Sequence, residues 1–408
     1  MGVEPEKKYD VAIVGAGPAG SSTAIRLAQN GLKVLLAEQK KFPRGKLCGE
    51  FISPECLAHF AELGVLSDMS LAGGVALDRT VFYTQSGRSL TVPSAWFGTD
   101  SGALGLSRAE MDTKLMIRAR SGGVDVLEET HAAGLLLVND KVCGVQLRNK
   151  DRDLFEIKAD VTLDATGRSR ILARQIDKSN TSTKRGRAKY VAFKTHLEGA
   201  HIPAGNCEIY GYHGGYGGSS RVENGLYNFC FIVSSELAKR YSGDAAELMK
   251  HIVLKNKQAQ RSLRDAAVVE EWLAVPIESY GRYELTPTDG LLTVGDAAAF
   301  VDPFTGSGIL LALESAKIAA GVIINEFLTG ETERSFTSLA REYQKQYAAA
   351  FDRRLRICSL LRHAAFAPFL AEAMILGLAM SSRLTRGLTQ ATRPAEHAGS
   401  HVKPQPSK

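Results

Sequence analysis

One stretch, residues 9–39, constrains the fold more than any other part of the sequence. Its first apolar run, residues 11–14, is typical of a strand buried on both faces. Three glycines in GxGxxG spacing follow at residues 15–20, and a helical pattern then runs to Gln29. A second strand is expected over residues 33–37. This order of elements predicts a βαβ unit that opens a doubly wound α/β domain.

Each glycine of the turn has its own physical reason. Gly15 permits the tight turn, Gly17 lets the backbone approach a diphosphate, and Gly20 lets the helix pack closely on the strand. Ala19 lies within the same turn. The helix that follows directs free N–H groups at an anion. Glu38, at the end of the second strand, is placed to accept hydrogen bonds from ribose hydroxyls, so the unit predicts a dinucleotide site.

A second turn near the other end of the chain indicates which dinucleotide is bound. Gly295 and Asp296 follow the apolar strand 291–294, and residues 302–308 precede a long apolar helix. An acid so far along the chain suits a ligand with a long polyol, and FAD has a ribitol where NAD has none. The helix that starts at Gly306 and Gly308 would direct N–H groups at the flavin edge that collects negative charge on reduction. We therefore predict FAD as the cofactor.

The pattern along the chain predicts three kinds of region. Strands rich in Tyr and Gly replace the βαβ pattern between about residues 181 and 283, with one helical insertion at 246–265. Ser107 and Glu110 form a capping-box pattern at the start of another helix. The expected fold is an α/β (α+β) protein with a Rossmann-like domain, an inserted mostly antiparallel sheet domain and a C-terminal helical extension. The expected boundaries are 1–74, 104–180 and 284–330 for the FAD-binding domain, 75–103 and 181–283 for the substrate domain, 331–393 for the helices, and 394–408 for a disordered tail.

Charge is unevenly distributed. From Phe351 onwards nine Lys and Arg residues face three acids, which accounts for the whole formal net charge of +6. Such a region can contact anionic lipid, an acidic partner or nucleic acid, and the alternative is a solvated helix face. We retain a peripheral membrane contact of the basic C-terminal helices as a prediction and expect no nucleic acid. The segment nearest to a membrane span, residues 364–382, is interrupted by Pro368 and Glu372.

Other signals exclude several classes of site. The six cysteines are scattered without a CxxC pair, which is typical of a reduced, cytoplasmic protein, and the first residues lack the apolar core of a secretory signal. His196 and His201 are not at helical ligand spacing, so no metal is expected. No Gly-x-Ser-x-Gly elbow and no HExxH motif are present.

Together the motifs resemble those of a known group of flavoproteins. They are residues 15–20 with Glu38, the segment 41–50 (KFPRGKLCGE), Arg108 within SRAEMD, residues 164–167 (DATG), and Gly295-Asp296 with 302–308 (DPFTGSG). The chain resembles the p-hydroxybenzoate hydroxylase superfamily and, within it, is most similar to the geranylgeranyl reductase family. The resemblance covers about residues 9–330.

The resemblance implies roles for individual residues. Glu38 would bind the adenosine ribose, Arg44 and Arg108 would lie along the ADP moiety, and Asp296 would hold the ribitol. Cys48 and Gly49 match a segment that passes close to the flavin ring, and with Tyr216 they are the expected catalytic residues. The expected cofactor-binding residues are Gly15, Gly17, Ala19, Gly20, Glu38, Arg44, Cys48, Arg108, Asp164, Gly167, Gly295, Asp296, Pro303, Gly306, Ser307 and Gly308.

Two activities remain open. The resemblance implies reduction of a carbon–carbon double bond in a hydrophobic small molecule, whereas a flavin-dependent monooxygenase would hydroxylate an aromatic or polyketide-like substrate with NAD(P)H and O2. Prenyl reductases carry a Tyr-x-Trp-x-Phe-Pro segment, of which only Tyr216 remains here, and the Trp-x-Trp-x-Ile-Pro signature of many halogenases is missing. No second GxGxxG unit is present, so NAD(P)H or another electron donor would act without a domain of its own. We favour the reductase. An electron-transfer flavoprotein is disfavoured because no cysteine cluster could hold an iron–sulfur partner site.

Overall fold

The structure is a computed structural model that describes most of the chain. The described residues are 8–97, 102–177, 188–277, 280–302, 304, 306–328, 335–365 and 368–393. The expected tail at 394–408 and the expected cofactor residue Pro303 lie outside them.

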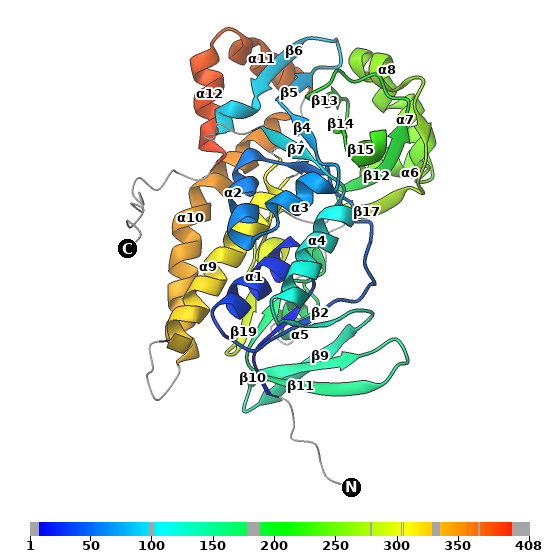
Figure 1. Cartoon of the computed structure of the whole chain (residues 1–408). Helices are drawn as coiled ribbons and strands as arrows, with labels where there is room; N and C mark the ends of the chain where they lie inside the picture. Colours follow the sequence, from blue (N-terminus) through cyan, green and yellow to red (C-terminus); the bar gives the residue numbers. More distant parts are fainter. Residues whose placement is uncertain are drawn as a thin grey trace, which may run out of the picture.

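The first sheet forms the body of the Rossmann-like part (Figure 1). Its strands run in the order β8-β2-β1-β11-β10-β9, and β19 pairs with the end of β11. β8, β2, β1, β11 and β19 are parallel, whereas β9 and β10 form an antiparallel hairpin on β11. The strands are β1 (Lys8–Val14), β2 (Val34–Ala37), β8 (Asp125–Leu127), β9 (His131–Val138), β10 (Lys141–Arg148), β11 (Leu154–Asp164) and β19 (Leu291–Thr293).

Helices bury the apolar strands of this sheet. Val11 and Ile13 are fully buried, and α1 packs against both α4 and α9. α1 begins with Pro18 in its first turn, where proline is favoured because its missing N–H would have no helical partner. The helices of this part are α1 (Pro18–Gln29), α2 (Pro54–Leu63), α3 (Leu66–Leu71), α4 (Arg108–Ser121), α5 (Ala173–Asp177) and α9 (Gly308–Leu328), with 3-10 turns η2 (Gly167–Ser169) and η5 (Gly295–Ala297).

Half of the expected capping box at α4 is replaced by a long-range contact. The Ser107 hydroxyl accepts the Glu110 N–H at 3.2 Å, as expected. The Ser107 N–H, however, donates to Glu223 at 2.9 Å rather than to Glu110. A carboxylate from the second sheet therefore completes the cap, which spacing along the chain could not reveal.

The second sheet is the expected, mostly antiparallel one. Its order is β16-β12-β15-β14-β13-β5-β6, β17 pairs with β12, and only β13 and β5 are parallel. Its strands are β5 (Arg79–Tyr83), β6 (Ser89–Pro93), β12 (Tyr190–Glu198), β13 (Asn206–Tyr212), β14 (Gly215–Arg221), β15 (Tyr227–Ser234), β16 (Ala267–Val268) and β17 (Leu273–Ile277).

The single helical insertion expected at 246–265 was wrong in its extent. Three short helices replace it, because the side chains of Ser234, Asp244 and Asn256 each cap a new start. Asn256, for example, accepts N–H groups of Gln258 and Ala259. The elements are α6 (Ser235–Arg240), α7 (Ala245–His251), η4 (Val253–Lys255) and α8 (Lys257–Leu263).

The C-terminal helices extend from the first sheet towards the second (Figure 1). α10 (Phe336–Ala365) packs along α9, whereas α11 (Pro368–Ala379) and α12 (Ser382–Ala391) pack against β6. The remaining short elements are β3 (Phe51–Ile52), β4 (Val75–Leu77), β7 (Ala103–Gly105), β18 (Gly281–Arg282), β20 (Ala299–Phe300), η1 (Ser94–Phe97) and η3 (Glu223–Gly225).

By length and composition, one helix of the described chain could cross a membrane. It is α9, whereas the sequence analysis named 364–382 as the segment nearest to a span and set it aside because Pro368 and Glu372 interrupt it. Of its most apolar window, 61% is buried inside the protein. Because α9 packs between α1 and α10, its apolar character is that of a core helix.

Candidate functional site

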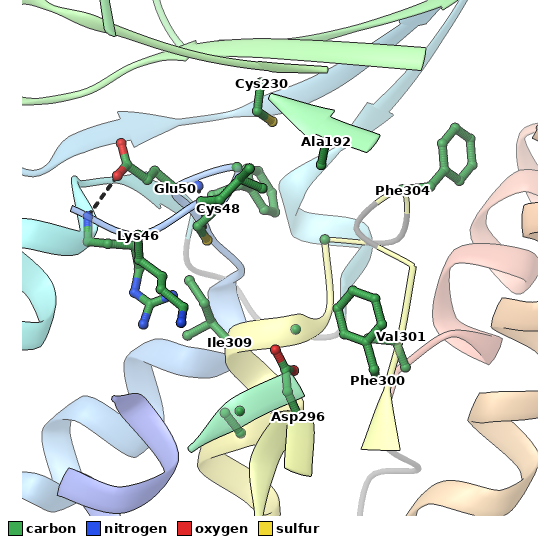
Figure 2. Close-up of a pocket in the computed structure, with 18 of the residues that line it drawn as sticks. Lys46, Cys48, Glu50, Ala192, Cys230, Asp296, Phe300, Val301, Phe304 and Ile309 are labelled. Carbon is green, nitrogen blue, oxygen red and sulfur yellow. Dashed lines mark hydrogen bonds between the residues drawn. The ribbon is translucent and has the colours of Figure 1, made fainter. Parts of the chain in front are cut away.

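A large cavity joins the two sheets. Its volume is about 790 Å³, and its wall runs from the glycine turn after β1 to the second sheet and the C-terminal helices. Figure 2 shows Asp296 and Ile309 on one side of it and Ala192 and Cys230, from the second sheet, on the opposite side. A cavity of this size between two domains is typical of a cofactor and substrate site.

The first glycine turn reaches the cavity as the sequence indicated. Gly15 has a φ of 104°, and a Cβ there would lie 2.4 Å from the Ala165 carbonyl oxygen. A Cβ on Gly20 would collide with the Gly15 carbonyl oxygen, which explains how closely α1 approaches β1. Gly15, Gly17 and Ala19 line the cavity, whereas Gly20 acts only through packing. The nearest atom to a Cβ on Gly17 would be an Arg108 nitrogen at 3.8 Å, so the backbone there is open to a ligand.

The second turn reaches the same cavity from the other side. Asp296, Gly306 and Gly308 line it, and Gly308 begins α9. Gly295 does not line it, but its φ is 61° and a Cβ there would lie 2.8 Å from the Ala19 Cβ. Gly295 therefore lets the two turns meet. Ser307 is buried and does not line the cavity.

Asp112, a residue that the sequence analysis did not identify, links the two arginines beside Glu38. The Arg108 guanidinium donates two hydrogen bonds to Asp112, at 2.9 and 2.7 Å. Arg44 donates to Asp112 at 3.0 Å and to Glu38 at 3.3 Å. Burial alone would lower the pKa of Arg108, but the Asp112 carboxylate raises it. The spacing of Arg108 and Asp112, one helical turn apart within SRAEMD, was the available signal.

Two further cations face the cavity without a carboxylate of their own. Lys46 and Arg168 line it, and neither forms an ion pair within the part of the chain that the structure describes. Burial, reinforced by the charges of Arg108 and Arg44, lowers the pKa of Lys46. An anion in the cavity would relieve this repulsion, so this end of the cavity is suited to a diphosphate.

The Asp296 carboxylate points into the cavity (Figure 2). It has no hydrogen-bond partner among the described residues. Burial raises the pKa of Asp296, although the charges of Arg168 and Lys46 oppose that effect. Its oxygens are therefore available to hydroxyl groups of a ligand.

Asp164, which the motif predicts as a cofactor-binding residue, does not line the cavity. It is fully buried, and its carboxylate accepts the N–H and hydroxyl of Thr166 and the N–H groups of Leu172 and Ala173. These bonds fix the turn that brings Gly167, which does line the cavity, to its place. Asp164 therefore shapes the site indirectly.

The three expected catalytic residues all line the cavity. The Cys48 sulfur accepts the Glu50 N–H at 3.4 Å, and the Asn228 side chain donates to the Gly49 carbonyl at 2.9 Å. The Tyr216 hydroxyl donates to Asp302, so its ring rather than its hydroxyl is left for a ligand. Burial, together with the Asp302 charge, raises the pKa of Tyr216 well above its usual value.

The far end of the cavity is apolar and is closed by the C-terminal helices. Met374, Ile375 and Leu378 of α11 and Leu388 of α12 line it, opposite aromatic and aliphatic side chains of the second sheet. The Arg393 guanidinium lies 4.1 Å from the centre of the Phe97 ring and 3.5 Å from Glu55. These two contacts hold the end of α12 against the rest of the protein. The C-terminal helices therefore cover this end of the cavity.

Comparison with known proteins bears on what this cavity holds. Residues 10–189 match the family model described as FAD dependent oxidoreductase. The digeranylgeranylglycerophospholipid reductase of Methanosarcina mazei is 29% identical over 83% of this chain and 80% of its own length. That of Methanococcoides burtonii is 26% identical over 84% and 80%.

The chain is an FAD-dependent oxidoreductase. It is related to the digeranylgeranylglycerophospholipid reductases, in agreement with the resemblance seen in the motifs. Solved structures share the fold of this oxidoreductase. A geranylgeranyl bacteriochlorophyll reductase-like protein of Thermoplasma acidophilum has a TM-score of 0.77 at 21% identity, covering 92% of this chain and 93% of its own. The flavin-dependent brominase Bmp2 has a TM-score of 0.78 at 19% identity, covering 96% of each chain.

The residues present fit the cofactor of this oxidoreductase. The open backbone at Gly17 and the cations without carboxylate partners suit the diphosphate, and the Asp296 carboxylate without a partner suits a polyol. Within the described residues no group of His, Cys, Asp or Glu is arranged to hold a metal ion.

Proposed function

We propose that this oxidoreductase reduces a carbon–carbon double bond in a hydrophobic, chain-like molecule. The observation that carries the proposal is the shape of the cavity, which joins a cationic end beside Lys46 to an apolar end beneath α11 and α12. Relatives named as reductases of a polyprenyl lipid support it. When bound, FAD supplies the hydride, so the protein has to position the substrate and exclude water.

The site residues divide into two groups in this proposal. Glu38, Arg44 and Arg108 hold the ADP moiety, Lys46 and Arg168 neutralise the diphosphate, and Asp296 binds the ribitol. The start of α9, at Gly306 and Gly308, faces the flavin edge, with Cys48 and Gly49 on the opposite side. Gly295 and Ser307 shape the second turn, the Tyr216 ring forms part of the substrate wall, and Pro303 stays a prediction outside the described residues. The cavity lining supports the assignments of the residues that line it, and Asp296 has no hydrogen-bond partner among the described residues.

Access from a membrane completes the proposal for a lipophilic substrate. The outer side of α11 and α12 exposes Leu376, Met380 and Leu384, of which Met380 is 88% and Leu384 64% exposed. Arg383 and Arg386 flank them on the exposed side of α12. Apolar residues among arginines favour a surface of anionic lipid. Because the inner side of the same helices lines the cavity, we propose that substrate enters from a bilayer at this corner.

An anaerobic experiment tests the reaction. The holoenzyme is reduced with dithionite under argon and then mixed with a lipid that carries unsaturated prenyl chains, with the saturated lipid as control. We expect the flavin to be reoxidised only by the unsaturated lipid, which gains two hydrogens per reduced bond by mass spectrometry. In a parallel sample to which oxygen is admitted after reduction, substrate-dependent oxygen consumption that leaves one oxygen atom in the product would instead identify a monooxygenase. The same assay can test other electron donors in place of dithionite. NAD(P)H is the first to try.

A further inference from the structure

A chain of ionisable side chains runs from the cavity wall to solvent, apart from the residues proposed to hold FAD. At its centre is Glu50, which is fully buried. One carboxylate oxygen of Glu50 accepts the Lys194 ammonium at 2.5 Å, and the other lies 2.6 Å from Nε2 of His196. The second ring nitrogen of His196 lies 2.8 Å from Glu270. The Glu270 side chain is 56% exposed, so the chain ends in water.

The same face of the second sheet holds the backbone on either side of Glu50. Lys194 pairs with Cys230 across β12 and β15, and His196 pairs with Asn228. Asn228 donates to the Gly49 carbonyl at 2.9 Å, and a Cβ on Gly49 would lie 3.8 Å from the Cys230 sulfur. The polar side chains of two neighbouring strands therefore fix the segment that follows Cys48.

Glu50 itself is held in an unfavourable conformation. Its φ is 51°, in the left-handed region that non-glycine residues rarely adopt. Such a conformation persists only where surrounding contacts impose it. Here the contacts are Lys194, His196 and the Arg108 N–H at the start of α4, which donates to Glu50 at 2.9 Å. Losing one of them would release the backbone of the cavity wall.

The charges of Glu50, Lys194, His196 and Glu270 are tightly coupled. Burial alone would raise the pKa of Glu50, but the His196 hydrogen bond and the Lys194 charge lower it. Burial alone would lower the pKa of His196, but its hydrogen bond and charge interaction with Glu50 raise it, with a smaller contribution from Glu270 and opposition from Lys194. The other ionisable groups close to Glu50 are Cys48 and Cys230, on the cavity side. Because these interactions raise the pKa of His196, we expect its proton to be lost only above the usual pH range of a histidine.

We propose that Lys194 and His196 are positioning residues that hold Glu50, and through it Cys48 and Gly49, against the bound flavin, in a clamp that His196 makes dependent on pH. The inference rests on the proposed placement of the flavin beside Cys48 and Gly49. A raised pKa means that the folded protein favours protonated His196. The charge that His196 contributes to the clamp is therefore present at low pH and is lost as the pH rises through that raised value, which weakens the hold on Glu50.

The test measures the flavin itself, with no substrate present. The visible absorbance of oxidised holoenzyme is recorded against pH for the wild type, His196→Gln, Glu270→Gln and the control Glu271→Gln, which removes an exposed acid next to Glu270. We expect one step in the wild type, above the usual histidine pKa of about 6.5. His196→Gln should lose the step. Glu270→Gln should shift it down by about half a pH unit, the size of a partly exposed ion pair, and Glu271→Gln should leave it in place.

Further measurements separate this inference from the proposed reaction. Lys194→Arg keeps the charge, so we expect it to retain the step, whereas Lys194→Met removes a cation that opposes protonation of His196 and should shift the step to higher pH. If Lys194→Met does not fold, Glu270→Gln still tests the clamp, because it changes only a partly exposed side chain. A step that survives in His196→Gln, or that shifts equally in both glutamate variants, would overturn the clamp. A normal step without reduction of any unsaturated lipid would overturn the proposed function and leave the clamp intact.

Discussion

Replacing Asp296 by Ala tests how the cavity holds its cofactor. The Asp296 carboxylate points into the cavity and has no hydrogen-bond partner among the described residues. A hydrogen bond from a ribitol hydroxyl to a charged acceptor contributes about 1.5–3 kcal/mol. Its loss should therefore weaken FAD binding about 10- to 150-fold, which is the same free energy expressed as a ratio of dissociation constants.

The assay is a fluorescence titration of the apoprotein with FAD at pH 7. Asp289→Ala serves as the control, because Asp289 lies just before the same strand β19 but is exposed and does not line the cavity. We expect Asp289→Ala to bind FAD like the wild type. A dissociation constant of Asp296→Ala within twofold of the wild type would refute the assignment of Asp296 to the ribitol.

The raised pKa of Asp296 also predicts how this residue changes the stability of the apoprotein with pH. Burial raises the pKa of Asp296, so the folded apoprotein favours the protonated acid more than the unfolded chain does. The stability that this contributes is present below the usual aspartate pKa of about 3.9 and is lost as the pH rises through the raised value. Asp296→Asn should consequently raise the thermal midpoint of the apoprotein at pH 7, and the gain should vanish towards pH 4. A cofactor-binding role explains why an acid that weakens the apoprotein is present.

Two further predictions concern the turn and the membrane corner. Gly295→Ala should lower the free energy of unfolding in urea by about 2–4 kcal/mol, because it combines a positive φ with a Cβ 2.8 Å from that of Ala19. The control Gly31→Ala has a φ of 81° and no atom within 4 Å of its Cβ. It should therefore lose only the backbone contribution of about 1–2 kcal/mol. Equal losses would contradict the close approach of the two turns. Met380→Glu combined with Leu384→Glu should abolish sedimentation with anionic vesicles, while Leu71→Glu, at an 85% exposed position on α3, should not. Binding that persists in the double variant would place the contact elsewhere.

The cofactor end of the cavity could be predicted because its parts are local in sequence. The turn at Gly15–Gly20 follows a strand and starts a helix, whereas the turn at Gly295–Asp296 follows β19 and is separated from α9 by the short strand β20. In each case the spacing fixes the backbone, and the backbone makes the site. FAD as the cofactor was confirmed for this reason, whereas the roles of single residues remain predictions.

The parts that could not be predicted are made by side chains from distant segments. Asp112 joins Arg44 to Arg108 across 68 residues of chain, and Glu50 meets Lys194 across 144. Asp164 matched a motif, yet folding turned its carboxylate inwards to four protein donors. A pattern along the chain gives the identity of such residues but not the direction in which they point.

The two ends of the cavity are therefore built on different principles. The cofactor end uses backbone N–H groups and glycines, which tolerate little change because a Cβ at Gly15 or Gly20 would collide with backbone atoms. The substrate end uses side chains of β14, α11 and α12, which can change size without disturbing that backbone. A fold built in this way can host different activities, because the apolar wall can change without altering the glycine turns. Specificity in this oxidoreductase should accordingly follow residues such as Met374 and Leu388 rather than the glycine turns.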